Sequence, residues 1–154
     1  MSLSEAVVVL SWKQGVAVMW TTQTRIRVTF LALMLMQALH SVEEYLFRFY
    51  AVFPPARLLN ALLPGFARPG FIAFNVFLVL LGFWCFSYRI RPRHKHARRW
   101  MWLWVAIELF NGVGHPVWAI ICRAYVPGLV TAIPMLCLAA YLAHLLTEQV
   151  EAGL

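Results

Sequence analysis

One short motif inside an apolar run carries the residues best suited to chemistry. Residues 28–50 hold His40, Glu43 and Glu44 in the pattern H-x-x-E-E. Residues three and four apart lie on one face of a helix, so the imidazole and both carboxyl groups should project to the same side. A charge at the centre of a membrane span costs about 2.5–3.5 kcal/mol on insertion scales. We therefore expect these groups to face a partner, a cavity or a metal ion.

A second polar set lies in another apolar run, residues 100–122. Glu108, Asn111 and His115 follow the pattern E-x-x-N-x-x-x-H, and these offsets keep the three side chains on one helical face. At about 1.5 Å per residue, the two sets reach overlapping depths, with Glu108 the deepest. We predict that the two polar faces meet inside a helical bundle, in the outer half of the bilayer.

These side chains form a ligand inventory for a divalent metal ion. Two histidines and three carboxylates suit zinc, iron or manganese. We predict that His40, Glu44 and His115 bind the metal. Glu43 and Glu108 are expected as further ligands or as the general base of a catalytic site.

Three uncharged residues are candidates for a supporting role. Asn111 is expected to orient a ligand or a water molecule. Asn75 and Thr131 are predicted to donate hydrogen bonds behind the ligands, although hydrogen bonds between packed helices explain them equally well. The whole polar set also has a metal-free interpretation, because buried His and Glu residues can pair to hold helices together, form a proton path or perform acid-base chemistry.

Composition places these residues in a membrane protein. The chain has 154 residues, 62% of them hydrophobic, and a mean hydropathy of +0.73. Soluble domains are about 45–50% apolar. We expect an all-α polytopic protein, a bundle of four transmembrane helices. The four predicted spans are residues 28–50, 71–88, 100–122 and 126–146, and the first is long enough to cross about 30 Å of hydrocarbon.

The segments between the spans complete the predicted organisation. Residues 1–24 are expected to be an interfacial or disordered segment, and residues 25–154 a single domain. A connection rich in Pro and Gly, residues 51–70, includes a short interfacial helix at 56–63. Gly112, Gly114 and Pro116 predict a kinked or thin helix next to His115. The three cysteines are expected to be packing residues.

The densest basic charge predicts the orientation in the membrane. Residues 89–99, RIRPRHKHARR, contain six Lys or Arg. The positive-inside rule places this loop and both termini in the cytoplasm. Because the basic residues are concentrated in one short loop and the aromatic residues lie in apolar runs, no nucleic-acid partner is expected. The expected partners are membrane lipids and a hydrophobic small-molecule substrate.

Three motifs taken together resemble a known family. H-S-V-E-E at 40–44, E-L-F-N-G-V-G-H at 108–115 and Y-V-P-G-L-V-T-A at 125–132 are similar to the HXXEE-domain family of small prokaryotic membrane proteins. The resemblance covers most of the chain from residue 28 and implies a prokaryotic inner membrane. It names no settled activity, and it suggests metal binding only through its first motif. A looser analogy links the buried His and Glu residues to the emopamil-binding-type sterol isomerases, which shuttle protons without a metal.

The sequence thus predicts a membrane-embedded, metal-dependent enzyme that hydrolyses, hydroxylates or isomerises a lipid or other hydrophobic substrate. Two alternatives stay open: a metal-free acid-base isomerase of a sterol or isoprenoid-like lipid, and a small proton- or metal-coupled transporter. Four helices are few for a transporter unless the chain forms a homodimer, and no inverted repeat is visible. The metal, the reaction, the oligomeric state and the role of residues 1–24 are left open.

Overall fold

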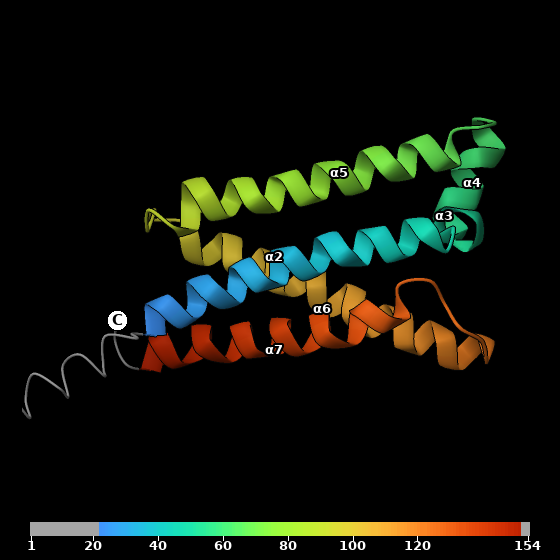
Figure 1. Ribbon diagram of the computed structural model, residues 1–154. Coiled ribbons are helices and arrows are strands. Elements are labelled where there is room, and N and C mark those ends of the chain that lie inside the picture. The colour runs from blue at the N-terminus through green and yellow to red at the C-terminus, as the bar shows by residue number, and fades with distance from the viewer. Residues whose placement is uncertain (1–21, 152–154) are drawn as a thin grey trace, which may run out of the picture.

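The computed structural model describes residues 22–151, and all the regular secondary structure in this part of the chain is helical (Figure 1). Four long helices are joined by short connections and by two short helices at one end of the bundle. In chain order the elements are α2 (Thr22–Leu46), α3 (Phe49–Val52), α4 (Pro54–Leu62), α5 (Ala67–Cys85), the π-helical turn η1 (Phe86–Ile90), α6 (Ala97–Cys122) and α7 (Leu129–Glu151). The fold class is the predicted all-α bundle.

The four long helices are long and apolar enough to cross a membrane. They are α2, α5 continued through η1 to Ile90, α6 and α7. Each carries a run of apolar side chains that remain exposed on the bundle surface, such as Phe74, Phe110 and Ile120. Exposed apolar surface of this kind fits an integral membrane protein, whose outer face meets lipid.

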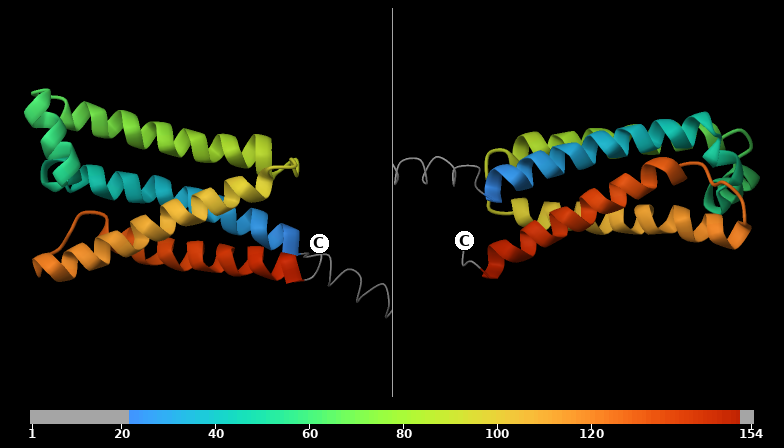
Figure 2. Two further views of the ribbon diagram at one scale, coloured as in Figure 1. Left: turned by 180° about the vertical axis from the view of Figure 1, so that it is seen from behind. Right: turned by 60° about the horizontal axis from the view of Figure 1, so that its bottom comes forward.

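α7 is the central packing element. It lies along both α6 and α2, and Figure 1 shows α6 crossing behind α2 at an angle, whereas the left view of Figure 2, from behind, shows it crossing in front. α5 lies at the edge of the bundle beside α2 and buries only Asn75, Gly82 and Cys85. Along its length the bundle has two different halves. One contains a tightly packed apolar core, and the other contains the polar residues.

The apolar core lies at the end where α2 begins and α7 ends. Phe30, Met34, Trp104 and Leu142 are fully buried there. Gly82 lets α5 approach this core, since a Cβ atom at this position would lie 2.3 Å from Met34 Sδ and 3.3 Å from Trp104 Cζ2. Packing in this half of the bundle sets the relative positions of the helices where they continue into the polar half.

The predicted end of the first span was wrong. α2 stops at Leu46, Arg48 has a left-handed backbone conformation with φ 59°, and α3 starts a new direction at Phe49. The break turns the Phe49 ring inward, where it is 6% exposed and packs against His115. α4, at Pro54–Leu62, is the short helix expected at 56–63, and it lies across the end of the bundle (Figure 1).

The predicted N-terminal segment is only partly described. Residues 22–24, expected within it, form the first turn of α2, and residues 1–21 lie outside the described part of the chain. α6 runs without interruption through Gly112, Gly114 and Pro116, so the helix is not broken beside His115. α7 extends to Glu151, beyond the predicted end at residue 146, because the helical run continues past the apolar run.

Candidate metal centre

Three predicted ligands come together where α2 and α6 face each other. Glu44 Oε1 lies 3.6 Å from His40 Nε2 and 3.3 Å from His115 Nε2. One ligand atom from each residue lies within 4.8 Å of the others, and the three residues are 0%, 5% and 4% exposed for His40, Glu44 and His115. Ligand atoms about 2.0–2.1 Å from a tetrahedral zinc ion are roughly 3.3 Å apart. The spacing of these atoms therefore suits a single bound ion.

The orientation of the His40 ring is fixed from α7. His40 Nδ1 lies 2.8 Å from Thr131 Oγ1, and the Thr131 hydroxyl donates to Glu43 Oε2 at 2.5 Å. A hydroxyl has one proton, so the Thr131 oxygen accepts the proton of His40 Nδ1. This tautomer leaves the lone pair of Nε2 directed toward Glu44. Nε2 is buried and has no hydrogen-bond partner among the described residues, as a metal-ligating nitrogen would require.

The structure gives Glu43 a different environment from Glu44. Its Oε1 accepts from the Tyr125 hydroxyl at 2.6 Å and from the backbone N–H groups of Gly128 and Val130 at 3.2 Å each. Its Oε2 accepts from the Thr131 N–H at 2.9 Å as well as from the Thr131 hydroxyl. The first N–H groups of a helix have no partners within the helix, so Glu43 satisfies the start of α7. Its role as a ligand or base stays a prediction.

Tyr125 is a stable donor to this carboxylate. It lies in the connection between α6 and α7. Burial, followed by the hydrogen bond to Glu43, raises the pKa of the Tyr125 hydroxyl to about 12. The phenol therefore stays protonated at neutral pH and keeps donating to Glu43.

The backbone of Gly128 forms one wall of the centre. This glycine has a positive φ of 94°, and a Cβ atom here would lie 2.7 Å from Cε1 of both His40 and His115. The two imidazole rings themselves meet edge to face with their centroids 4.7 Å apart. No larger residue fits between the backbone and the rings.

Aromatic side chains cover the centre at the end of the bundle. The centroid of the Phe49 ring lies 5.0 Å from that of His115 and 5.7 Å from that of Trp118. Phe53 stacks on Phe49, with the centroids 4.9 Å apart. The short helix α3 thus shields the histidines from the aqueous phase at this end.

The remaining predicted carboxylate, Glu108, lies deeper in the bundle. It is fully buried, and the Gln37 amide nitrogen, when turned toward it, donates to its two oxygens at 2.8 and 3.2 Å. Seven residues separate Glu108 from His115 along α6, about 10 Å. Asn111 is half-buried between them on the same helical face. Glu108 is therefore not brought together with the three candidate ligands.

Asn75 belongs to α5 and lies on the side of α2 that faces away from α7. Ser41 Oγ donates to Asn75 Oδ1 at 2.7 Å, and Asn75 Nδ2 donates to the Phe71 carbonyl at 3.1 Å. These bonds attach α5 to α2. Thr131, by contrast, contacts a candidate ligand directly. Asn75 and Thr131 had the same predicted role, but of the two it is Thr131 that contacts a candidate ligand.

Sequence reasoning missed Gly128, Tyr125 and Gln37. The first two belong to the Y-V-P-G run just before α7, where a turn signal directly precedes an apolar helix. That pattern marks a helix start whose N–H groups need an acceptor. Gln37 was detectable as a polar residue one turn before His40 on the same face.

The fold and the centre together define a helical protein with four membrane-length helices and a buried His/Glu cluster. Over residues 28–143 the chain matches the family model described as a protein of unknown function with HXXEE motif. The chain belongs to this family. A search of curated proteins and a search of solved structures each found no match.

Proposed function

We propose that the protein is a membrane-embedded enzyme that binds a divalent metal ion through His40, Glu44 and His115. The candidate ions are zinc, iron and manganese, and the substrate is a lipid or another hydrophobic molecule. Hydrolysis, hydroxylation and isomerisation are all compatible with the ligand set. The observation that carries this proposal is the unpartnered Nε2 of His40, held at ligand spacing from Glu44 by the Thr131–Glu43 pair.

The number of protein ligands supports a catalytic role. Zinc enzymes hold the ion with three protein ligands and leave a position for water or substrate, and two histidines with one carboxylate are also typical of iron oxygenases. The neighbouring carboxylate, Glu43, is occupied with the start of α7. A bound ion would supply a polarising charge and an activated water molecule.

The protein side chains would hold and move protons around this centre. Glu43 and Thr131 keep the His40 ring in one tautomer. Glu108, paired with Gln37 below the centre, is the candidate to take up or deliver a proton, and Asn111 stands between it and His115.

An open apolar hollow supports a hydrophobic substrate. It has a volume of about 560 Å³ and is lined by Glu43, Phe47, Tyr125, Val130 and Thr131. Its surface is almost entirely apolar, and Thr131 separates it from His40. A lipid entering the hollow from the bilayer would come within one side chain of the candidate ligand.

The test uses products and metal dependence together. Full-length protein, purified in detergent, is incubated with a membrane lipid extract, and the lipids are compared by mass spectrometry with those treated with His115→Ala. We expect new lipid products from the wild-type chain alone, lost after chelation and restored by zinc, iron or manganese. Identical lipid profiles from both proteins under all conditions would reject the enzyme.

The polar residues also support a metal-free alternative. Gln37 and Glu108 lie below the cluster of His40, Glu44 and His115, so polar side chains continue along the bundle. Such a series suits proton transfer in an acid-base isomerase or a small coupled transporter. Product formation that survives chelators would favour the isomerase. Proton or metal flux in proteoliposomes that is lost in Glu43→Gln would favour the transporter.

We further propose that the basic loop, residues 89–99, faces the cytoplasm of a prokaryotic cell. Arg25 and Arg27 lie at the start of α2, and the positive-inside rule places both basic groups on the cytoplasmic side. The candidate centre would then lie in the outer half of the bilayer. A single cysteine replacing Lys95, in a chain without the native cysteines, should react with an impermeant thiol reagent only in permeabilised cells. Labelling in intact cells would reverse the orientation.

A further inference from the structure

An apolar groove runs between α2 and α5 on the outer surface of the bundle. Its volume is about 350 Å³, and its walls include Val42, Ile72, Val76 and Leu80. Along α5 the lining extends from Phe71 to Leu80, about 14 Å at the helical rise. One leaflet contributes about half of the 30 Å hydrocarbon core. The groove therefore has the length of one leaflet's hydrocarbon.

The polar groups at the base of the groove are satisfied within the protein. Ser41 donates to Asn75 Oδ1, and the Asn75 amide donates to the Phe71 carbonyl. The groove consequently offers van der Waals contact and no free hydrogen-bonding group to an occupant. A hydrocarbon chain matches such a surface. Another helix would match it less well, because polar contacts commonly join helices in the membrane.

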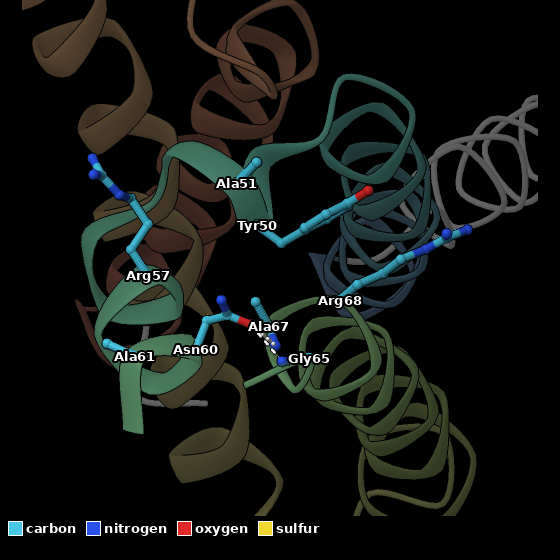
Figure 3. A pocket seen from close by; sticks show the side chains of 8 residues that line it. All are labelled: Tyr50, Ala51, Arg57, Asn60, Ala61, Gly65, Ala67 and Arg68. Carbon is cyan, nitrogen blue, oxygen red and sulfur yellow. Dashed lines mark hydrogen bonds between the residues drawn. The ribbon is translucent and has the colours of Figure 1, made fainter. Parts of the chain in front are cut away.

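A cation is fixed at the end of the groove. Arg68 lies in the first turn of α5, where this membrane-length helix begins, and its Nη2 donates to the Tyr45 hydroxyl at 2.5 Å. The Arg68 guanidinium carbon also lies 5.5 Å from the centroid of the Tyr45 ring, and Tyr45 lines the groove. Figure 3 shows Arg68 reaching from α5 toward α2. The guanidinium is thus held against Tyr45, at one end of the apolar walls.

Arg68 has no carboxylate partner among the described residues. The sequence has no acidic residue from Tyr45 to Ile107. Within the described residues 22–151, no carboxylate lies within ion-pair distance of Arg68. The free donors of the guanidinium are therefore available to an external anion, and Arg binds phosphate through paired N–H groups.

We propose that this groove binds one anionic phospholipid, with its phosphate on Arg68 and an acyl chain between α2 and α5. The site is separate from the candidate metal centre and does not depend on its chemistry. A guanidinium suits an anionic head group because it binds phosphate through paired N–H groups.

Arg57 provides a matched control for charge alone. It lies on α4, and with Arg68 it lines a second cavity of about 490 Å³ at this end. Figure 3 shows the two side chains extending in opposite directions, with Arg57 away from α2. Arg57 does not line the α2–α5 groove. Arg68 does not line the groove either, but of the two arginines it is Arg68 that bonds to Tyr45, a residue that does line it. Removing either arginine changes the net charge equally.

Native mass spectrometry of the full-length protein measures the bound lipid. Detergent-purified protein is titrated with phosphatidylglycerol and, separately, with phosphatidylcholine. We expect the wild-type protein to bind one phosphatidylglycerol per chain. Arg68→Gln should retain about tenfold less of this lipid than wild type, and Arg57→Gln should retain about as much as wild type. Equal losses in the two variants would show attraction by charge alone and overturn the proposal. Displacement of the lipid by inorganic phosphate at millimolar concentration would show a bare anion site and overturn it as well.

A second pair of variants tests the acyl-chain half of the proposal. Val76→Trp fills the groove, and Val113→Trp adds the same bulk to a surface position on α6; the two valines are 52% and 47% exposed. We expect Val76→Trp to lower retention of phosphatidylglycerol about tenfold and Val113→Trp to retain it. Full retention by Val76→Trp would overturn the site. A dimer that Val76→Trp dissociates would assign the groove to a second copy of the chain.

Discussion

Gly128 sets the limit on side-chain size at the candidate centre. Its positive φ and its contacts with both imidazole rings come from one residue in the connection before α7. The positive φ of Gly128 and the close contact of its backbone with the imidazole rings both bring the start of α7 against the two histidines.

Gly128→Ala should therefore destabilise the folded protein. A non-glycine residue in this conformation costs about 1–3 kcal/mol in strain, and the added methyl group would also displace His40 and His115. The measurement is the thermal unfolding midpoint in detergent. Gly114→Ala is the matched control, since nothing lies within 4 Å of its position and alanine favours a helix. A Gly128→Ala protein as stable as Gly114→Ala would contradict this reading of the backbone.

The connection before α7 joins two structural tasks. Glu43 of α2 accepts hydrogen bonds from the first N–H groups of α7, and the same carboxylate holds Thr131 against His40. The start of a helix and the tautomer of a candidate ligand therefore depend on one side chain. Changes at this start should affect stability and metal binding together.

The Tyr125 hydroxyl should make the stability of this junction dependent on pH. Folding raises the pKa of Tyr125 from 10.0 to about 12, so the folded state favours the protonated phenol. The stabilisation is fully present below about pH 10 and is lost as the pH rises toward 12. Because the side chain is 47% exposed, we expect Tyr125→Phe to cost only about 1 kcal/mol at neutral pH.

The pH dependence is measured by comparing the unfolding of wild type and Tyr125→Phe across that range. Their difference should be constant up to about pH 10 and should shrink above it. Tyr141→Phe serves as the control, because Tyr141 is 44% exposed on α7 and donates no hydrogen bond to a described residue. A wild-type advantage that persists unchanged to pH 12 would contradict the assigned role of the hydroxyl.

The helices were predictable because each apolar run is long and bounded by turn or charge signals. The end of α2 was not, because nothing in the apolar run from residue 28 to 50 marks the reversal at Arg48. That reversal follows from packing Phe49 onto His115, a contact across the bundle. Helix ends that depend on tertiary contacts cannot be read from local patterns.

Part of the centre was predictable from the spacing of its residues. The spacing of His40, Glu44 and His115 places them on helical faces at one depth, and the structure brings those side chains together. The surroundings of Glu43 were not predictable, since its partners lie 82 to 88 residues away in sequence. Adjacent carboxylates in one motif thus have different partners.

The whole molecule separates a packed apolar half from a polar half. Trp104 and Phe30 fix the helices in the first half, and the second half holds the centre under the aromatic cover of α3. α5 remains at the edge beside α2, with the lipid groove between them. The proposed metal and lipid sites therefore lie on different sides of α2 and can be tested independently.

Metal content is the measurement that tests the central proposal most directly. The full-length protein is purified without a histidine tag, loaded with zinc, washed free of excess and analysed for bound metal. His144 and Glu148 supply the control, because they repeat the i, i+4 spacing of His40 and Glu44 with nitrogen and oxygen 3.2 Å apart on an exposed surface. We predict about one ion per chain for wild type and His144→Ala, and little for His115→Ala or Glu44→Ala. Wild type without metal, or His115→Ala with as much metal as wild type, would contradict the account.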